Sequence, residues 1–484
     1  MRILFATPEL APWVKSGGLG DVSQALPVAL AQAGAEIRVL LPYYPALAAR
    51  FPVAPVLARL STQWGDLPAA CLREIDPGTG PRLWCLDCPE LYARPGSAYQ
   101  DQTGRDFSDN ARRFALLARV AAHLAGTASP VPWRPDIVQG NDWPLGLAPA
   151  YAHYASVPHA PVVMAVHNLA FQGNFALSEL GALGLPPQAA TPESAEYFGQ
   201  LSFLKAGLQH AEHIVTVSPR YAREILDESF GYGLAGLLRW RQKDLSGILN
   251  GIDTTLWNPA QDTALAATYD ATNLIPKCEN TRALRQALKL DEEPGHMLIG
   301  MVGRLTEQKG VDLVLAAVAD ILALPAQLAL LGTGDKRLQE AWRELASRHP
   351  GRVAAIIGFD ETLAHRIEAG ADLFLMPSRF EPCGLNQMYS MRYGTPPVVH
   401  AVGGLADTVV DASPENLATG SATGFCFHAP EVPAMLGALR RACALWADRN
   451  AWQGLMVNGM CRDFGWTPVA EAYLALYRRL AAAA

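Results

Sequence analysis

The sequence predicts an α/β protein built from two doubly wound domains, each a parallel sheet covered by helices. Short aliphatic runs, typical of buried strands, alternate with longer Ala- and Leu-rich segments of helical spacing. This alternation begins at Arg2–Ala6 and restarts near Met297. Polar and glycine-rich segments follow several of the predicted strands, and in open α/β sheets ligands bind beyond the carboxyl ends of strands.

The first half of the chain contains five predicted strands. The helix-like segments between them include Asp21–Ala33, Asn110–Ala125 and Glu193–His210. The stretch Val53–Leu86 is different, because turn signals break it into short runs, and we interpret it as inserted hairpins. The predicted strands are Arg2–Ala6, Glu36–Leu41, Asp136–Gln139, Val162–Val166 and Ile214–Val217.

The second half repeats the strand and helix alternation. The turn signal Asn250-Gly251 lies where the first domain meets the second, so we expect an N-terminal domain over residues 1–248 and a C-terminal domain over 249–464. We expect a final helix over residues 465–484. That helix has an apolar stripe, which must dock on another surface. The predicted strands are Met297–Val302, Gln327–Leu331, Val353–Ile357, Asp372–Met376 and Pro397–Val399, and the helices are Val311–Ala323, Lys336–Ser347, Glu361–Ala369 and Leu385–Tyr393.

Composition and charge exclude several classes of protein. Hydrophobic residues make up 50% of the 484, which excludes global disorder. The net charge of −7, with no Lys/Arg run, speaks against nucleic-acid binding. The first apolar stretch ends at Pro8, too early for a signal peptide, and no segment is long enough to span a membrane. We therefore expect a soluble, cytoplasmic protein without a membrane partner.

Cysteine and histidine spacing predicts no metal site. The eight cysteines include one isolated C-x-x-C pair, Cys85 and Cys88, whereas a zinc ribbon needs two such pairs. No H-x-x-x-H or H-E-x-x-H spacing occurs. We expect reduced, mostly buried thiols and no protein-bound metal.

A glycine-rich loop follows the first strand and carries Lys15, Gly17, Gly18 and Asp21. Adjacent glycines before a helix let a ligand approach the backbone, and the helix N-terminus offers free N–H groups to an anion. The loop matches neither G-x-G-x-x-G nor the P-loop motif. A flexible loop with a solvent-exposed lysine is the alternative.

Two cations stand at the corresponding place in the second half. Arg304 and Lys309 follow the strand Met297–Val302, where together they would neutralise a diphosphate. The alternative is surface charge with Glu307 as the ion-pair partner.

The loop after strand Asp372–Met376 contains Glu381 and Cys383. Glu381 is suited to accept hydrogen bonds from sugar hydroxyls, and we interpret Cys383 as a packing residue, because nothing pairs it with a base. The backbone N–H groups of Gly384, Leu385 and Asn386 are candidates to face a phosphate.

Polar groups also follow two strands of the first half. His167 and Asn168 come after one strand, and Asp142 and Trp143 follow another. Such groups suit the hydroxyls of a sugar. A lone histidine is more often a structural residue, and its place directly after a strand favours a functional one.

Together these segments resemble, in order and spacing, the bacterial glycogen synthase and plant starch synthase family. The resemblance covers essentially the whole chain. The matching motifs are Lys15-x-Gly17-Gly18-Leu19, Pro95-Gly96-Ser97-x-Tyr99, Val166-His167-Asn168-Leu169, Leu249-Asn250-Gly251-Ile252-Asp253, Gly303-Arg304-Leu305-Thr306-x-Gln308-Lys309-Gly310, Ser378-Arg379-Phe380-Glu381-Pro382-Cys383-Gly384-Leu385 and Arg392-Tyr393-Gly394-Thr395-Pro396.

The resemblance implies a GT-B glycosyltransferase, in which two Rossmann-like domains face each other across a cleft. It implies transfer of glucose from ADP-glucose to the non-reducing 4-OH of an α-1,4-glucan (glycogen or a maltooligosaccharide) with retention of configuration, and neither a metal nor another cofactor. It also implies that the final helix packs back on the N-terminal, acceptor-side domain, with the donor on the C-terminal domain.

The resemblance assigns roles residue by residue. The expected catalytic residues are Lys15, Asp142, His167 and Glu381. Phe359 is expected to stack on the base. The other expected donor-binding residues are Lys15, Gly17, Gly18, Asp21, Asn168, Asn250, Arg304, Lys309, Glu381, Cys383, Gly384, Leu385 and Asn386, and the acceptor-binding residues are Tyr99, Asp142, Trp143 and His167.

The chain departs from the family pattern at a few positions. The usual His-Asp-Trp-His stretch is Asn141-Asp142-Trp143-Pro144, Gly20 replaces Ala, and Asn386 replaces Thr. We expect these changes to affect the preferred acceptor and the turnover rate more than the class of reaction. The alternatives are a related transferase with another nucleotide-sugar or acceptor, a glucan phosphorylase with a pyridoxal phosphate lysine, and a degenerate glucan-binding protein.

Overall fold

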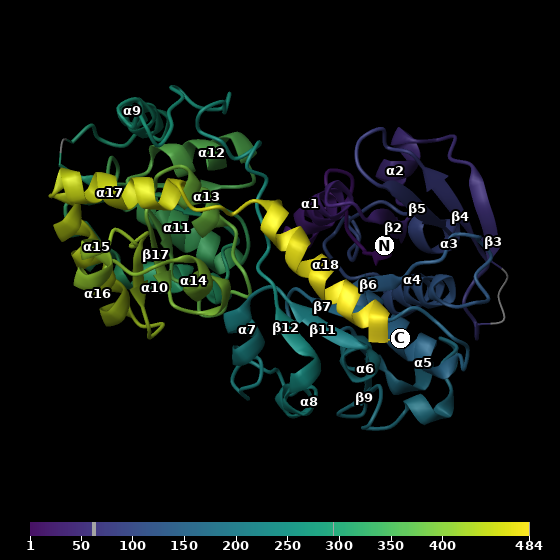
Figure 1. Cartoon of the computed structure of the whole chain (residues 1–484). Coiled ribbons are helices and arrows are strands. Elements are labelled where there is room, and N and C mark those ends of the chain that lie inside the picture. The colour runs from purple at the N-terminus through teal and green to yellow at the C-terminus, as the bar shows by residue number, and fades with distance from the viewer. Residues whose placement is uncertain (61–63, 294, 484) are drawn as a thin grey trace. The chain divides into compact units, whose positions relative to one another are not determined.

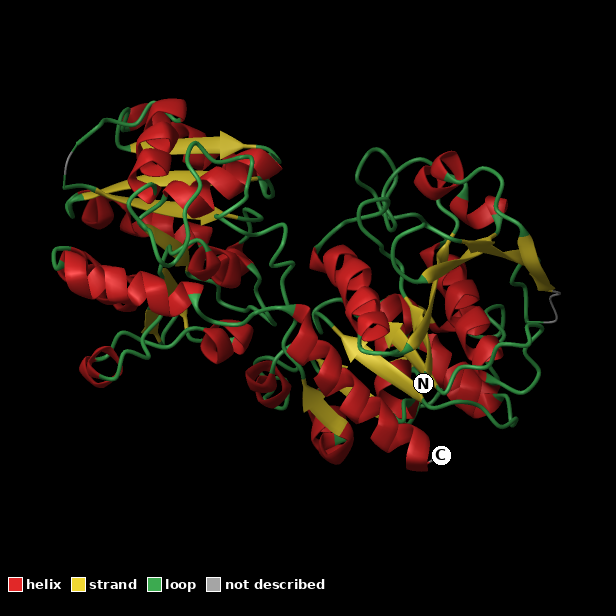
Figure 2. Cartoon of the chain, turned by 45° about the horizontal axis from the view of Figure 1, so that its top comes forward, coloured by secondary structure: helices red, strands yellow, loops and turns green. Residues whose placement is uncertain are grey.

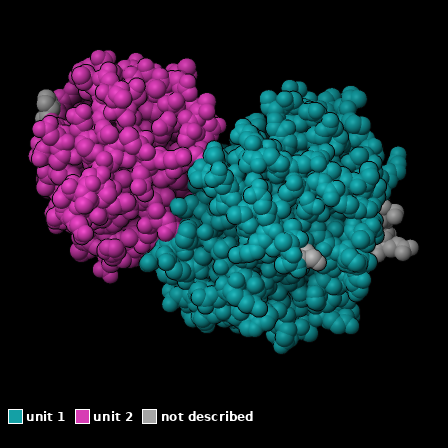
Figure 3. All heavy atoms as spheres, viewed as in Figure 1, with its two compact units in different colours: residues 1–251, 466–484 teal, residues 252–465 magenta. Residues whose placement is uncertain are grey.

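The computed structural model describes residues 1–60, 64–293 and 295–483. The chain forms two compact units: unit 1 comprises residues 1–251 and 466–484, and unit 2 comprises residues 252–465 (Figure 3). The sequence placed the corresponding boundaries at 248/249 and 464/465. The final segment is thus counted with the unit formed by the first half of the chain.

Unit 1 is built on one large mixed sheet. Among its described residues the strand order is β12-β11-β7-β6-β1-β2-β5-β4-β3 (Figure 1). Strands from β12 to β5 are parallel, and the edge pairs β5–β4 and β4–β3 are antiparallel. The bounds are β1 (Arg2–Ala6), β2 (Glu36–Pro42), β3 (Val56–Leu60), β4 (Ala70–Ile75), β5 (Arg82–Asp87), β6 (Ile137–Asn141), β7 (Val162–Val166), β11 (His213–Thr216) and β12 (Leu245–Gly247).

The parallel core follows from the composition of its strands. Every residue of β7 is apolar and buried, as expected for a strand covered on both faces by helices. The hairpins expected within Val53–Leu86 are present, and they extend the main sheet because β5 pairs in parallel with β2. The helices of unit 1 are α1 (Gly18–Gln32), α2 (Pro45–Arg50), α3 (Pro89–Tyr92), α4 (Asn110–Ala125), α5 (Leu147–Tyr154), α6 (Phe203–His210), α7 (Pro219–Glu224), α8 (Ala235–Trp240) and α18 (Trp466–Ala483).

One helix prediction is wrong over its first half. The segment Glu193–His210 is helical only in α6, because Ser202 caps that helix by accepting a hydrogen bond from the amide of Lys205. The residues before it form a small antiparallel sheet of order β8-β10-β9. Its strands are β8 (Asn174–Ala176), β9 (Glu196–Tyr197) and β10 (Gln200–Ser202).

Unit 2 contains a parallel sheet of order β15-β14-β13-β16-β17-β18 in the described part of the chain, with helices on its faces (Figure 2). It matches the second alternation predicted from the sequence. Its strands are β13 (Met297–Val302), β14 (Ala326–Gly332), β15 (Val353–Ile357), β16 (Leu373–Met376), β17 (Pro397–His400) and β18 (Phe425–Phe427). Its helices are α9 (Lys277–Ala287), α10 (Val311–Leu322), α11 (Lys336–Arg348), α12 (Glu361–Gly370), α13 (Asn386–Arg392), α14 (Gly403–Thr408), α15 (Pro414–Ala418), α16 (Val432–Trp446) and α17 (Arg449–Met460).

Helix α18, yellow in Figure 1, packs on α1 and β6 of unit 1. Its apolar stripe joins the core formed by β1, β2 and α1, and Leu474 and Tyr477 are 3% and 0% exposed. None of the helices in the described residues is both long and apolar enough to cross a membrane.

The docking of α18 predicts a stability effect. Replacing Leu474 with Ala should lower the free energy of unfolding of unit 1 by about 2–5 kcal/mol, because the lost methyl groups leave a cavity in the core. Arg478→Ala, on the exposed face of the same helix, is the control and should change it by less than about 0.5 kcal/mol. Urea unfolding followed by tryptophan fluorescence measures both, and equal effects would contradict the packing of α18.

Candidate functional site

The predicted residues of unit 1 gather at one edge of its sheet. Strands β1, β6 and β7 are parallel neighbours, with Ala6 opposite Gly140 and Asn141 opposite Ala165. Parallel pairing places their carboxyl ends together, so the loops that follow the three strands meet there. These loops carry the Lys15 segment, Asp142 and His167.

Asp142 is held in an unusual backbone conformation. Its φ is +55°, which is uncommon for a residue other than glycine. Its Oδ1 accepts a 2.7 Å hydrogen bond from the amide of His167 and a 3.4 Å bond from the amide of Asn168. Burial raises the pKa of Asp142 to about 7, although both hydrogen bonds oppose the shift. At neutral pH this carboxyl therefore exchanges between its neutral and ionised forms.

The ring of His167 is positioned by a chain of buried amides. Its Nε2 lies 3.1 Å from Oδ1 of Asn141, whose Nδ2 donates to the carbonyl of Ala6 at 2.8 Å. Because Asn141 presents an oxygen, His167 carries its hydrogen on Nε2 and leaves Nδ1 as an acceptor. Burial lowers the pKa of His167 to about 4, so the ring is neutral at neutral pH.

The chain of amides continues to the C-terminal helix. Nε2 of Gln139 donates to Oδ1 of Asn141 at 3.0 Å, and the hydroxyl of Tyr477 donates to Oε1 of Gln139. The network links α18 to His167 through two residues of β6. Asn141, where the resemblance led us to expect His, is therefore the residue that orients the ring of His167.

Glu9 is a residue of this edge that sequence reasoning missed. It is 3% exposed, and its Oε2 accepts from the amides of Ser16 and Gly17 at 2.6 and 3.2 Å. Its Oε1 accepts from the hydroxyl of Tyr99 at 2.7 Å. Burial raises the pKa of Glu9. Its place three residues after the first strand was the available signal.

The Lys15 loop leaves the start of α1 open. Lys15 pairs with Asp21 at 2.8 Å, and both side chains are partly exposed. Gly17 is the N-cap residue and forms no side-chain cap, and its extended backbone would suit any residue. A Cβ at Gly17 or Gly18 would meet nothing within 4 Å. The two glycines therefore keep space free in front of the first amides of α1.

The aromatic residues expected to bind an acceptor are largely engaged within the protein. Trp143 packs against Phe114 at 4.8 Å between ring centroids and lies in a cluster with Tyr99. Gly173 makes room for Trp143, because a Cβ there would lie 2.2 Å from Cε3 of Trp143.

Asn250 is 7% exposed, and its buried Oδ1 has no hydrogen-bond partner among the described residues.

The predicted residues of unit 2 gather at the carboxyl ends of β13 and β16, which are parallel neighbours. Nζ of Lys309 lies 2.5 Å from Oε2 of Glu381, which also accepts from Oγ of Ser378 at 3.0 Å. The Glu381 side chain is 8% exposed. Gly310 makes this approach possible, because a Cβ there would lie 2.0 Å from the carbonyl oxygen of Pro377.

The other cations of this edge differ in their partners. Arg379 forms two 2.7 Å hydrogen bonds to the carboxylate of Asp312 and is thereby fixed. Glu307 pairs with Arg337, not with Arg304. Arg304 is exposed and forms no ion pair within the described residues. It is the cation most available to an anion.

The loop before α13 leaves backbone amides unsatisfied. The amides of Leu385 and Asn386 bond to no acceptor in the described chain, and no side chain caps α13. Asn386 instead donates through Nδ2 to the carbonyl of Val302 at 2.7 Å, which ties the loop to the end of β13. Cys383 is 6% exposed, and Gly384 has a φ of +71°.

Phe359 lies in the loop after β15 and is 82% exposed. Such exposure of a large aromatic residue leaves its ring free to stack on a planar group.

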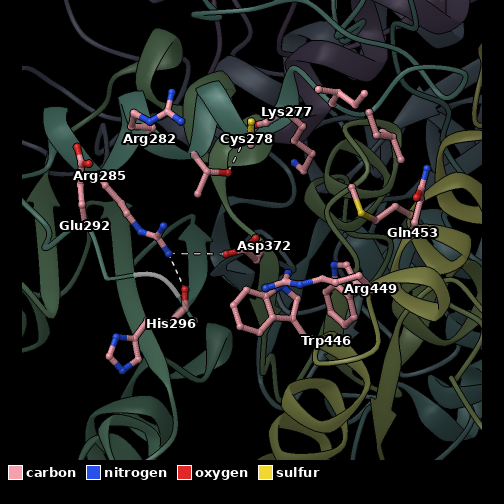
Figure 4. Close-up of a pocket in the computed structure, with 16 residues that line it drawn as sticks. Lys277, Cys278, Arg282, Arg285, Glu292, His296, Asp372, Trp446, Arg449 and Gln453 are labelled. Carbon is pink, nitrogen blue, oxygen red and sulfur yellow. Dashed lines mark hydrogen bonds and ion pairs between the residues drawn. The ribbon is translucent and has the colours of Figure 1, made fainter.

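A cavity of about 630 Å³ lies elsewhere in unit 2 (Figure 4). Its His296 and Asp372 directly precede β13 and β16, so it lies at the amino ends of the strands whose carboxyl ends carry Lys309 and Glu381. Its Lys277 donates to two carbonyls and to Thr395, and Arg285 donates to Gln327 and a carbonyl. The described lining contains none of the predicted site residues.

The raised pKa of Asp142 predicts a pH-dependent stability difference. Unfolding returns its pKa to about 3.9. The stability gained from the protonated carboxyl is therefore complete below about pH 4 and is lost as the pH rises through about 7. The variant Asp142→Asn does not titrate there, so its stability relative to the wild type should rise from pH 4 to 7 and level off above.

Urea unfolding at pH steps between 4 and 8.5 measures this difference. Asp66→Asn, an exposed aspartate of the same unit, controls for the loss of one charge. A stability difference between Asp142→Asn and the wild type that stays constant with pH would contradict the assignment.

Comparison with known proteins identifies the family. The starch synthase catalytic domain model matches residues 2–240, and the glycosyl transferases group 1 model matches residues 281–453. The chain is 56% identical to a glycogen synthase of Dechloromonas aromatica over 99% of this chain and 98% of that one. It is 54% identical to a glycogen synthase of Aromatoleum aromaticum, over 100% and 98%.

A solved structure agrees with this result. The catalytic domain of starch synthase IV from Arabidopsis thaliana, bound to ADP and acarbose, is 32% identical, with a TM-score of 0.85 and 99% of both chains covered. Sucrose-phosphate synthase from Thermosynechococcus elongatus shares the fold, with 22% identity, a TM-score of 0.59 and full coverage of both chains. The chain therefore belongs to the glycogen synthase and starch synthase family of GT-B glycosyltransferases.

Proposed function

We propose that this enzyme transfers glucose from ADP-glucose to the non-reducing 4-OH of an α-1,4-glucan, with retention of configuration and release of ADP. The observation that carries the proposal is the arrangement of Arg304, Lys309 and Glu381 at the carboxyl ends of β13 and β16. Relatives named glycogen synthase and the starch synthase bound to ADP and acarbose support the choice of substrates.

Unit 2 supplies the donor-binding groups in this proposal. Breaking the anomeric C–O bond places negative charge on the leaving diphosphate. Arg304, Lys309 and the open amides of Leu385 and Asn386 stabilise that charge, because preorganised donors lose little in reorganisation. Phe359 stacks on the base, and Glu381 accepts hydrogen bonds from the glucose hydroxyls.

The Lys309–Glu381 ion pair implies an exchange of partners. Lys309 is paired with the nearly buried carboxylate of Glu381. A diphosphate that approaches Lys309 competes with Glu381 for the positive charge of the lysine. The Glu381 carboxylate is then free to accept a hydrogen bond from a sugar hydroxyl. The same pair thus links recognition of the phosphate to recognition of the sugar.

Unit 1 supplies the acceptor-binding groups and Lys15. Neutral His167 offers Nδ1 to a hydroxyl, and Asp142 fixes the loop that carries it. We propose that the acceptor hydroxyl attacks on the face that the diphosphate leaves, and that the departing phosphate oxygen takes the hydroxyl proton. This step retains configuration without a covalent glycosyl-enzyme, and trapping such an adduct on Asp142 or Glu381 would overturn it.

The free state of all eight cysteines supports a cytoplasmic location.

Nucleotide release tests the reaction directly. ADP-glucose and UDP-glucose are each incubated with the enzyme, with and without glycogen, in the presence of EDTA. We expect release of ADP that depends on glycogen. Glycogen-dependent release of UDP alone would indicate another donor, and no release from either donor, together with retention on a glucan column, would favour a non-catalytic glucan-binding protein. Release abolished by EDTA would contradict metal independence.

The donor site predicts matched mutational effects. Lys309→Ala and Arg304→Ala should each lower kcat/KM for ADP-glucose by about 100-fold or more, because each removes a cation from the developing charge. Lys336→Ala and Arg337→Ala, exposed cations on α11, are the controls and should change it by less than about twofold. If the control variants lost as much kcat/KM as Lys309→Ala and Arg304→Ala, the effect would reflect the loss of any positive charge, and the donor-binding roles would be contradicted.

A further inference from the structure

The hairpin that joins β9 to β10 carries an unexpected residue. Tyr197 pairs with Gln200, so Phe198 and Gly199 form a two-residue turn, with φ values of +48° and +80°. Turns with two positive φ angles favour Asn-Gly, Asp-Gly or Gly-Gly, because a bulky side chain is strained in the left-handed region. Phe198 therefore contradicts the local preference of its position.

Packing does not compensate for this strain. Phe198 is 83% exposed. Its one ring contact among the described residues is with the edge of Tyr197, at 4.7 Å between centroids and 84° between planes. Neither burial nor turn preference explains a phenylalanine here, and strained residues are retained where they serve binding or catalysis.

The turn is held on a rigid support. The amide of Gly199 donates to Oε1 of Glu196 at 2.6 Å, and the hydroxyl of Tyr197 donates to the carbonyl of Tyr232 at 2.6 Å. Lys205, 9% exposed, donates through Nζ to the carbonyls of Pro192 and Glu196. The exposed ring of Phe198 is thus presented at a defined position and not on a loose loop.

The hairpin is continuous with the candidate site of unit 1. Strand β10 pairs with β8, which lies on the segment that follows His167 and Asn168. Gln172 of that segment donates to the same carbonyl of Tyr232 that holds Tyr197, at 2.8 Å. Phe171, next to Gln172, is 53% exposed. Two exposed aromatic rings therefore lie on linked segments that lead away from His167.

The chemistry of the hairpin favours a neutral, partly apolar ligand. Lys205, a cation beside it, is buried and committed to carbonyls, so the turn offers little to a phosphate. A pyranose ring presents a face of C–H groups that packs on an aromatic ring. Trp143, the aromatic residue expected to bind the acceptor, is already packed in a cluster, whereas Phe198 is available.

We propose that Phe198 is a remote stacking contact for the acceptor glucan, which holds glucose units several residues from the reacting end. The proposal rests on the proposed function for its ligand. It predicts that long glucans gain from this contact and that short acceptors, which end near His167, do not.

The variant Phe198→Asn tests the proposal. Asn-Gly is a favoured sequence for this turn, so the variant should unfold at the same temperature as the wild type or higher. The glycogen concentration that gives half-maximal rate should rise at least fivefold. The KM values for maltotriose and for ADP-glucose should change by less than twofold. Phe198→Trp should restore the response to glycogen, because it restores an aromatic face.

Val53→Asn is the matched control, since it replaces another exposed apolar residue of unit 1, which precedes the edge strand β3 of the large sheet, whereas Phe198 belongs to the separate small sheet. It should leave every parameter unchanged. An unchanged half-saturating glycogen concentration in Phe198→Asn, or an equal loss with maltotriose, would overturn the proposal. A changed oligomeric state with unchanged glucan affinity would also overturn it, in favour of a protein contact.

Binding measured without catalysis separates this proposal from the proposed function. In affinity electrophoresis through gels that contain glycogen, the wild type should be retarded more than Phe198→Asn. If the wild type is retarded in this way yet releases no nucleotide from ADP-glucose, the proposed reaction fails and the contact stands. If both proteins migrate alike while ADP release is normal, the contact fails and the reaction stands.

Discussion

Parallel strand pairing is the constraint on which the candidate residues of each unit depend. In unit 1 it sets the loops after β1, β6 and β7 side by side, and in unit 2 it does the same for the loops after β13 and β16. The carboxyl ends of parallel strands lie at the same edge of the sheet. The loops that follow the strands therefore meet there, although their residues are distant in sequence. The glycines at 173 and 310 then allow the close approaches that these loops need.

The polar groups of unit 1 form a network that has to be satisfied as a whole. Tyr477, Gln139 and Asn141 lead to the ring of His167, and each is buried. Buried polar groups are costly when unpaired, so the network restricts His167 to one tautomer and one orientation. Asn141 is suited to this place, because its amide oxygen accepts from Nε2 of His167. Helix α18 thereby contributes to the site as well as to the core.

Most of the cations near the candidate residues form ion pairs with carboxylates of the protein itself. Lys15 pairs with Asp21, Lys309 with Glu381 and Arg379 with Asp312, whereas Arg304 stands alone in the described chain. A partly exposed pair such as Lys15–Asp21 contributes little to stability, so it opposes only weakly the exchange of a carboxylate for a phosphate that the proposed function requires. Arg379 is different, because its two hydrogen bonds to one carboxylate fix the loop that presents Glu381.

Sequence by itself determined most of the parallel strands, most of the intervening helices and the loops that carry the candidate residues, but it missed β12 and β18 and did not show that β5 pairs in parallel with β2. Those features depend on local periodicity and on motifs of fixed spacing, such as the segments around Lys15 and Glu381. It also indicated the apolar stripe of α18, because that stripe is a pattern within one helix.

Only the tertiary structure decided the partners of these residues. The hydroxyl of Tyr477 and the amide of Gln139 are 338 positions apart, and no local pattern predicts that they meet. Burial, which raises the pKa of Asp142 and lowers that of His167, is a property of the assembled sheet and its loops. The Phe198 turn was hidden within a helix-like pattern, because spacing alone does not distinguish a hairpin that packs on a neighbouring segment from the start of a helix. Long-range pairing settled these points, since it determines which groups lose contact with water.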